Sequence, residues 1–494
     1  MNSPVNQAFY QSIQTDRSST ASLYLQISKQ FIVSISNGTL KPGQKLIGTR
    51  RLSELLGIHR NTATAVYNEL AEQGWIDVFP NKGAFISKQL PEQNAEERPI
   101  KQYPIRTGFD FQQSILLDNP FEYTSCEFLL NDGIPDIRLT SVEILSHYYS
   151  ANLKRKGNRK KMGYYNQEGS EYFKEQLVHY LHGSRNFHIA PENILITRSI
   201  EMSLYIISEI VLKPEDRVVV GDLSYFEANM IFQKSGSKIH TIPLDEEGIS
   251  AKALRELCLR EKIRMLYITP QQHYPTTISM SFSRKMEILQ LAYEFGFIIL
   301  EDDHDYDFQY SKQAALPLSS LDQKGMCIYI SSFGKSLAPG FRTGFIVCPK
   351  NLMKEMRKHL GIIDRQGDIL MEQALGEMIE EGEIHRHIKK SIKIYKERRD
   401  LFADLLKEEL GEFISFEVPS GGLAFWITWN TPINLLKLSK NALIQDVFIP
   451  KTLLYQQNTI CGMRIGFGDL DFSEMKEVMQ RFRIAVLNTI IVVR

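Results

Sequence analysis

The stretch SSFGKSLAPGFRTGF, residues 331–345, sets a lysine and an arginine in two successive turns built from small residues. Lys335 follows the turn that begins at Ser332, and Arg342 stands seven positions later, after a proline and a glycine. The apolar run MCIYI before this stretch predicts a buried strand that ends where the first turn begins. A lysine in a shielded turn can form a Schiff base with an aldehyde, so the neighbouring segments decide the chemistry of this stretch.

Short apolar runs alternate with helical patterns on the N-terminal side of this stretch. We expect strands at 194–197 and 217–221 and within IRMLYITP (263–270) and GFIILEDDHDYDF (296–308). We expect helices at 200–211 and within SRKMEILQLAYEFG (283–296). This alternation predicts an α/β fold with a mostly parallel sheet, in which ligands bind at the carboxyl ends of the strands.

Polar clusters follow these strands, and EDDHD (301–305) is one of them. Its Asp302 and Asp303 allow three interpretations: a solvated acidic loop, a divalent metal site, or a buried carboxylate that holds a protonated ring nitrogen. Pyridoxal 5'-phosphate requires a lysine for its aldehyde, an acid for its pyridine nitrogen and donors for its phosphate. Lys335 and Asp302 meet the first two requirements. Ser332 and Arg342 flank the lysine as phosphate donors, so we expect a pyridoxal phosphate site and no metal.

The chain divides into zones of different composition. Residues 1–19 are polar, residues 20–88 predict a compact domain, and residues 126–494 carry the α/β pattern. Between them, residues 89–125 are rich in proline, glutamine and charge and predict a linker. A length of 494 residues is consistent with two or three domains.

Residues 20–88 predict a winged helix-turn-helix. Helical patterns cover 23–36, TRRLSELLG (49–57) and 59–74, and WIDVFPNKGAFISK (75–88) predicts a hairpin. In such domains the second helix of the turn enters the major groove of double-stranded DNA by its N-terminal residues. The order helix, helix, helix, hairpin therefore predicts a DNA-binding domain.

Side chains suited to DNA lie in this domain, where eight lysines and arginines oppose four acidic residues. Arginine and asparagine can read guanine and adenine edges by paired hydrogen bonds. We expect contacts to base edges from Arg60, Asn61 and Thr62, and contacts to the DNA backbone from Arg50, Arg51 and Lys82. The alternative is a small helical protein-interaction domain with a solvated basic face.

The composition of the chain bears on its partners, on disulfide bonds and on its place in the cell. Lysine plus arginine and aspartate plus glutamate both total 58, so the whole chain predicts no polyanion partner. The five cysteines are far apart and odd in number, which argues against a disulfide framework. The N-terminus has no apolar signal region, and no apolar run approaches the ~18 residues of a membrane span. We expect a cytoplasmic protein with no membrane partner.

Motifs along most of the chain resemble the MocR/GabR-type bacterial regulators. TRRLSELLGIHRNTATAVYNELAEQGWI and NKGAF resemble the GntR-type winged helix, and EDDHDYDF, SSFGKSLAPGFRTGF and GMRIGFGDL resemble motifs of fold type I aminotransferases. The resemblance implies a pyridoxal phosphate-binding domain with a small C-terminal subdomain from about residue 375. It also implies a homodimer, and a two-fold protein predicts a repeated or palindromic operator.

The resemblance implies a role for each residue of the cofactor site. Lys335 would form the Schiff base, and Asp302 would pair with the pyridine nitrogen. Tyr225 would stack on or edge the ring, and His304 stands where a tyrosine often bonds the ring hydroxyl. Ser332 and Arg342 would contact the phosphate, and Arg464 would bind the carboxylate of a substrate or effector.

The phosphate loop departs from the family pattern. The family has a glycine and a glutamine where this chain has Ser199, Ile200 and Glu201. A glutamate beside a phosphate is electrostatically unfavourable, and serine lacks the backbone freedom of glycine. A weakened or empty cofactor site is therefore an alternative to tight binding.

Three functions follow from these observations. We expect a transcriptional regulator whose aminotransferase-like domain senses a small amino compound through the Lys335 aldimine, which biases the arrangement of the winged helices. The alternative is an active aminotransferase with a DNA-binding appendage, with Lys335 as general base. A third interpretation is a metal-dependent enzyme that uses EDDHD. The winged helix favours the regulator, because a metabolic enzyme does not need a recognition helix.

Overall fold

The computed structural model describes residues 9–91, 104–118, 122–163, 168–311, 315–457 and 460–491. The chain forms two compact units, Met1–Gln112 and Gln113–Arg494. The division falls inside the expected linker 89–125, of which residues 92–103 and 119–121 lie outside the described residues. The finer boundaries at 20, 88, 126 and 375 stay predictions. Within the described residues, no helix has the length and apolarity needed to span a bilayer.

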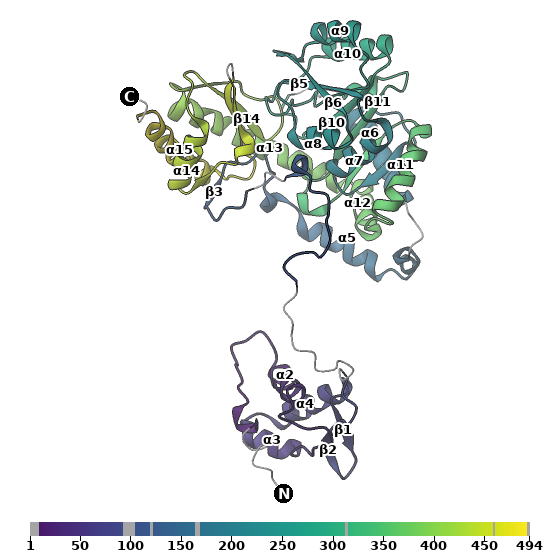
Figure 1. Cartoon of the computed structure of the whole chain (residues 1–494), viewed down its shortest axis with the longest axis vertical. Helices are drawn as coiled ribbons and strands as arrows, with labels where there is room; N and C mark the ends of the chain where they lie inside the picture. Colours follow the sequence, from purple (N-terminus) through teal and green to yellow (C-terminus); the bar gives the residue numbers. More distant parts are fainter. Residues whose placement is uncertain are drawn as a thin grey trace. The chain divides into compact units, whose positions relative to one another are not determined.

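The first unit has the expected order of three helices and a hairpin (Figure 1). Its elements are α2 (Leu23–Ser36), α3 (Thr49–Leu56), α4 (Arg60–Glu72), β1 (Ile76–Phe79) and β2 (Gly83–Ile86). Gly57 ends α3 in the left-handed conformation, at φ 61°, which glycine adopts without steric cost. Phe31, Leu52, Val66 and Leu70 are fully buried between the helices, so the predicted apolar faces form one core.

The second unit is built on a seven-stranded sheet of order β4-β12-β11-β10-β9-β5-β6. The strands are β4 (Ile194–Thr197), β5 (Arg217–Gly221), β6 (Lys238–Ile242), β9 (Met265–Ile268), β10 (Ile298–Asp303), β11 (Cys327–Ser332) and β12 (Gly344–Val347). Neighbours from β11 to β6 pair in parallel, and β12 runs antiparallel to both β4 and β11. The predicted α/β fold with a mostly parallel sheet is confirmed.

Helices cover both faces of this sheet. The helices are α5 (Val142–Lys154), α6 (Glu171–Arg185), α7 (Ile200–Val211), α8 (Phe226–Lys234), α9 (Ala251–Arg260), α10 (Phe282–Phe295), α11 (Lys350–Ile363) and α12 (Ile369–Glu380). Apolar side chains of α7, α8 and α11 pack with Val218 and Leu300. Side chains of α9 and α10 pack with Val219 and Ile299, which are the sequence neighbours of Val218 and Leu300 in the same two strands. Because successive strand residues face opposite ways, these contacts fill the two faces.

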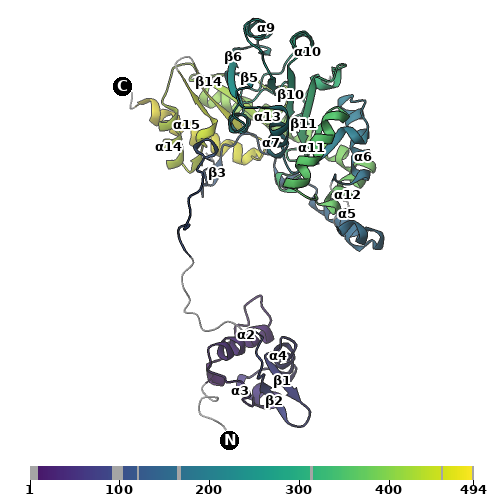
Figure 2. The same cartoon turned by 45° about the vertical axis from the view of Figure 1, so that its right-hand side comes forward.

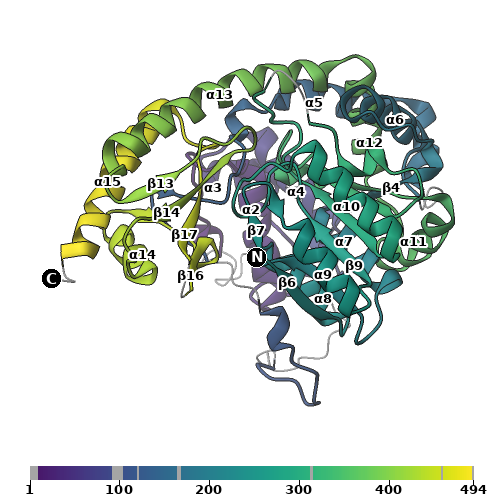
Figure 3. The same cartoon turned by 90° about the horizontal axis from the view of Figure 1, so that it is seen from above.

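A long helix, α13 (Glu383–Leu410), leads to a smaller antiparallel sheet (Figure 3). This sheet has the order β13-β14-β17-β16 and shares a core with side chains of α13 and of the two helices that follow it. Its elements are β13 (Ile414–Phe416), β14 (Ala424–Trp429), α14 (Leu435–Ile444), β16 (Leu454–Gln456), β17 (Cys461–Gly466) and α15 (Phe472–Ile491). In Figures 1 and 2, α14 and α15 lie at one end of the second unit, and α6 and α11 at the other.

Candidate functional site

A cavity of about 210 Å³ lies where the parallel strands of the large sheet end. Its lining comes from the ends of β10 and β11, the loop between β11 and β12, and the N-termini of α7 and α8. All six residues expected to hold the cofactor line it: Lys335, Asp302, Tyr225, His304, Ser332 and Arg342. Arg464 lies outside the lining that the described residues form. The segments carrying these residues span more than a hundred positions, so the fold brings them together.

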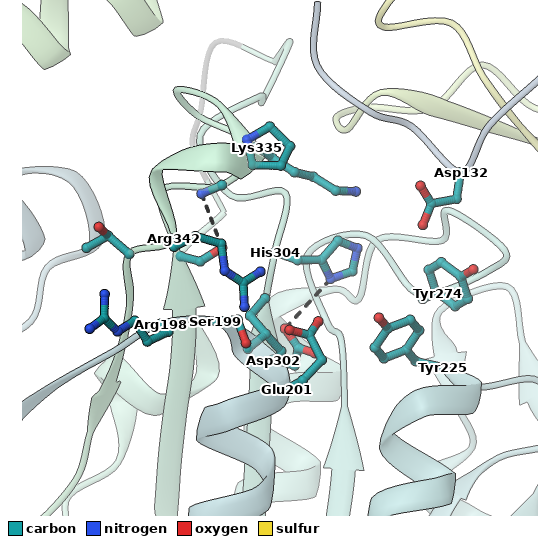
Figure 4. A pocket seen from close by; sticks show the side chains of 15 residues that line it. Asp132, Arg198, Ser199, Glu201, Tyr225, Tyr274, Asp302, His304, Lys335 and Arg342 are labelled. Atoms are coloured by element: carbon teal, nitrogen blue, oxygen red, sulfur yellow. Dashed lines mark hydrogen bonds and ion pairs between the residues drawn. The ribbon is translucent and has the colours of Figure 1, made fainter. Parts of the chain in front are cut away.

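Lys335 lies in the turn after β11 and extends into the cavity (Figure 4). Its Nζ lies 3.1 Å from Oδ1 of Asp305. The lysine side chain keeps 20% of its surface exposed, whereas that of Asp305 is 1% exposed. The amine is therefore oriented by a buried carboxylate and remains open to a ligand.

Asp302 is the last residue but one of β10 and lines the cavity, and the residue is 2% exposed. Its Oδ2 accepts a hydrogen bond from the Tyr267 hydroxyl at 2.8 Å. Its Oδ1 is buried and has no hydrogen bond from any described residue. A buried carboxylate oxygen without a donor is costly, and a protonated ring nitrogen would satisfy it.

His304 lies between Asp302 and Asp305, and Figure 4 shows its contact with Asp302. Its Nδ1 is 3.8 Å from Asp302 Oδ1, and its Nε2 is 3.3 Å from Asp305 Oδ2. Burial alone lowers the pKa of His304, but the charge of Asp305 and the contact with Asp302 outweigh it and raise the pKa to about 9. The imidazole is therefore protonated at neutral pH, and both of its nitrogens are donors.

Asp305 connects the site to Arg464. Its Oδ2 lies 3.6 Å from Arg464 Nη2, while its Oδ1 contacts Lys335. Burial raises the pKa of Asp305, yet the positive charges of Lys335, His304 and Arg464 outweigh it and hold the pKa well below its usual range. Asp305 is not among the residues expected from the sequence to hold the cofactor. Its position within EDDHD, two residues after a strand end, was the only available signal.

The N-terminus of α7 faces the cavity beside two cationic side chains. Ser199 caps this helix, with its Oγ accepting from the Met202 amide at 3.2 Å. Arg342 lines the cavity without an ion pair to any described residue, whereas Arg198 is paired with Asp364 at 2.6 Å. A helix N-terminus and an unpaired guanidinium favour an anionic group. Glu201 lines the same cavity and opposes this preference.

Two tyrosines form an aromatic wall. The ring centroids of Tyr225 and Tyr274 are 5.1 Å apart at an interplanar angle of 72°. The Tyr225 hydroxyl donates to Glu227 Oε2 at 2.6 Å. Tyr274 and Asp132 also line the cavity, and neither is among the site residues expected from the sequence. Tyr274 lies shortly after the expected strand segment IRMLYITP (263–270), whereas Asp132 is contributed by a segment near the start of the second unit.

The residues present fit pyridoxal phosphate. The cavity holds a lysine amine and a buried carboxylate oxygen without a donor, and an unpaired arginine lies beside a helix N-terminus. This donor set matches the aldehyde, the pyridine nitrogen and the phosphate of the cofactor. Within the described residues, no three His, Cys, Asp or Glu side chains form a group that could hold a metal ion.

The residues expected at DNA lie on the surface of the first unit. Arg60, Asn61 and Thr62 form the first turn of α4, and His59 caps it by accepting from the Asn61 amide at 3.3 Å. Arg50 and Arg51 project from α3 with 85% and 68% of their side chains exposed, although both contact Glu54. Lys82 is exposed in the turn of the hairpin. Their contacts with DNA stay predictions.

Comparisons with known proteins give both units a family. Residues 134–482 match the model "Aminotransferase class I and II", and residues 23–86 match "Bacterial regulatory proteins, gntR family". The chain is 25% identical to the uncharacterized HTH-type transcriptional regulator YdeL of Bacillus subtilis, over 94% of this chain and 96% of that protein. It is 23% identical to the probable rhizopine catabolism regulatory protein MocR of Rhizobium meliloti, over 96% of this chain and 95% of the relative.

Solved structures agree with the match to the aminotransferase model. The second unit resembles the kynurenine aminotransferase of Pyrococcus horikoshii, solved in complex with PMP, at a TM-score of 0.68 and 26% identity. That similarity covers 74% of this chain and 92% of the aminotransferase. The expected resemblance to MocR-type regulators, with pyridoxal phosphate as cofactor, is confirmed. The chain belongs to the aminotransferase class I and II family and carries a GntR-family helix-turn-helix ahead of its aminotransferase domain.

Proposed function

We propose that this chain is a pyridoxal phosphate-dependent, DNA-binding transcriptional regulator that senses a small amino compound at Lys335. One observation carries the proposal: a GntR-type winged helix shares a chain with a cavity where Lys335, Asp302 and Arg342 converge. The relatives that match over nearly the whole chain are named as regulators, which does not favour the active aminotransferase.

Each residue of the cavity has a distinct task. When bound, pyridoxal phosphate supplies an aldehyde to which a primary amine can bond. Asp302 would hold a proton on the ring nitrogen, and protonated His304 would donate to the ring oxygen. Arg342, Ser332 and the N-terminus of α7 bind the phosphate. Asp305 holds the Lys335 amine in its orientation.

With the cofactor bound, Lys335 would bond its aldehyde carbon, and a ligand amine would compete with the Lys335 Nζ for that carbon. A Lys335 side chain that is not bonded would place its ammonium charge next to Asp305, which also contacts His304 and Arg464. The response reaches DNA if the effector binds two arrangements of the protein with different affinity. We propose that the active form is a homodimer, whose two winged helices read an operator with repeated half-sites.

The test is a visible absorption spectrum of the purified protein after addition of pyridoxal phosphate. Wild type is expected to show a band of the lysine-bound cofactor, and Lys335→Ala is expected to lack it. The matched control is Lys354→Ala, which removes an exposed lysine of α11 and should retain the band. A wild-type protein without the band would contradict the cofactor role of Lys335 and would support an empty site caused by Ser199 and Glu201.

A further inference from the structure

The long helix α13 of the second unit carries a row of lysines. Lys389, Lys393 and Lys396 follow one another at spacings of four and three residues, so they lie on one face of the helix, with Lys390 beside them. All four side chains are exposed, whereas the opposite face of α13 is buried. In Figure 3, α13 runs along the outer edge of the second unit. These four residues, the lysine row, are therefore open to a partner along their whole length.

The lysine row has no acidic partner of its own. Arg386, one turn earlier, is paired with Glu383 at 2.6 Å. In contrast, none of the four lysines makes an ion pair or a hydrogen bond with a residue that the structure describes. Lys389 and Lys393 are four residues apart, a spacing at which like charges destabilise a helix. The row therefore costs stability in the free protein, and an anionic partner would offset that cost.

The chemistry of the row favours phosphates over other anionic surfaces. A lysine ammonium is a mobile point charge, which suits a phosphate better than the edge of a base. Because α13 exposes no large apolar side chain, the row lacks the anchors that a membrane surface or an apolar protein interface uses.

The length of the row also fits a nucleic-acid backbone. At a rise of ~1.5 Å per residue, Lys389 and Lys396 are about 10 Å apart along the helix axis. Phosphates of one DNA strand follow one another every ~3.4 Å along the duplex axis, so the row spans about three of them.

We infer that the lysine row of α13 binds the phosphate backbone of the DNA that the first unit reads. The inference rests on the proposed DNA-binding function and adds a second contact surface, on the aminotransferase unit. The first unit brings the duplex to the same chain, so contacts that are weak by themselves add to the total affinity. Because phosphates carry no sequence information, the row contributes affinity rather than specificity.

The test measures DNA affinity of the full-length protein over a series of salt concentrations. The duplex holds a sequence that the protein selects from a random pool and extends beyond it on both sides. Changing Lys389, Lys393 and Lys396 together to glutamine is expected to reduce the slope of log affinity against log salt by about 2–3. Affinity at low salt should fall by about tenfold or more, while the preference for the selected over a scrambled sequence stays unchanged.

The matched control changes three exposed lysines of other helices to glutamine. Lys252 of α9, Lys354 of α11 and Lys440 of α14 remove the same total charge, and this variant should keep the wild-type slope. A second measurement needs no variant: acetylation of wild-type lysines, followed by mass spectrometry. Bound DNA should slow the acetylation of Lys393 and leave that of Lys252 unchanged.

The outcomes separate the lysine row from the winged helix. If the triple variant of the row keeps the wild-type salt slope, or if DNA does not protect Lys393, the inference is overturned and the proposed function stands. Binding of the row to vesicles of anionic phospholipid, with an unchanged DNA slope in the variant, likewise overturns it. A wild-type protein that selects no DNA contradicts the proposed function and this inference together.

Discussion

The recognition helix of the first unit and the cavity of the second unit use charge in opposite ways. Arg60 and Lys82 are exposed and have no ion pair within the described residues. In the cavity, Asp305 is buried and contacts Lys335, His304 and Arg464. Exposed cations remain hydrated and available to a polyanion. A buried ion destabilises the fold when it loses its oppositely charged partner. Substitutions should therefore affect binding in the first unit and stability in the second.

The largest effect is expected at the centre of the buried network. Asp305→Asn would leave three cationic side chains near one another without their shared carboxylate. Removing one partner from a buried ion pair costs about 3–5 kcal/mol, so we expect a comparable loss in the free energy of unfolding. Denaturant unfolding of the second unit measures it. Asp404→Asn is the matched exposed control, and an equally small effect in both variants would contradict the described network.

A smaller effect is expected from pH. His304 has a folded-state pKa of about 9, above its ordinary value of 6.5. Its protonation therefore stabilises the fold fully below pH 6.5, and this contribution is lost as the pH rises to about 9 and above. Unfolding measured from pH 6 to 10 should show this decline in wild type. His304→Gln should flatten the decline, and an unchanged profile would refute the raised pKa.

The first unit allows a comparison between base contacts and phosphate contacts. Arg60→Ala is expected to weaken operator binding by about 1–3 kcal/mol and to relax the preference for one base pair. Arg50→Ala is expected to weaken binding to all sequences similarly and to reduce the salt slope by about 1. Neither variant should change the unfolding free energy by more than about 0.5 kcal/mol. An equal loss of sequence specificity in both variants would contradict the assignment of Arg60 to base edges and of Arg50 to phosphates.

The smallest expected effect is at the cap of α4. His59 accepts from the Asn61 amide at 3.3 Å, and serine is a better N-cap than histidine. His59→Ser should stabilise the first unit by about 0.5 kcal/mol and leave the visible spectrum of the cofactor unchanged. Thermal unfolding of the first unit and the spectrum test the two parts separately.

Elements with a strong local pattern were predictable from the sequence. The helix expected at 23–36 and the strands at 194–197 and 217–221 have the predicted bounds. Pairings between distant segments were not predictable. For example, β15 (Val447–Phe448) pairs with β3 (Phe128–Leu129), and the antiparallel direction of β12 follows from a turn rather than from its own residues.

The candidate site shows the same limit. Asp302 and Asp303 are adjacent in β10, so their side chains face opposite sides of the sheet. Asp302 faces the cavity. Asp303 points away from the cavity, and its Oδ2 accepts a hydrogen bond from the Tyr329 hydroxyl at 2.6 Å. Periodicity could suggest this separation. It could not show that Asp305 contacts Lys335 or that Asp132 lines the cavity, because both depend on how loops from distant segments meet.

The most direct test of the regulator is the affinity of the cofactor-loaded protein for DNA as amine is added. The DNA is selected by the protein from a random-sequence pool, and Lys335→Ala is measured in parallel. We predict that amine changes the affinity of wild type with the same midpoint as the change in its visible spectrum. Lys335→Ala should bind the same DNA without responding to amine. A wild-type affinity that stays constant while the spectral change goes to completion would contradict the proposal that the cavity controls DNA binding.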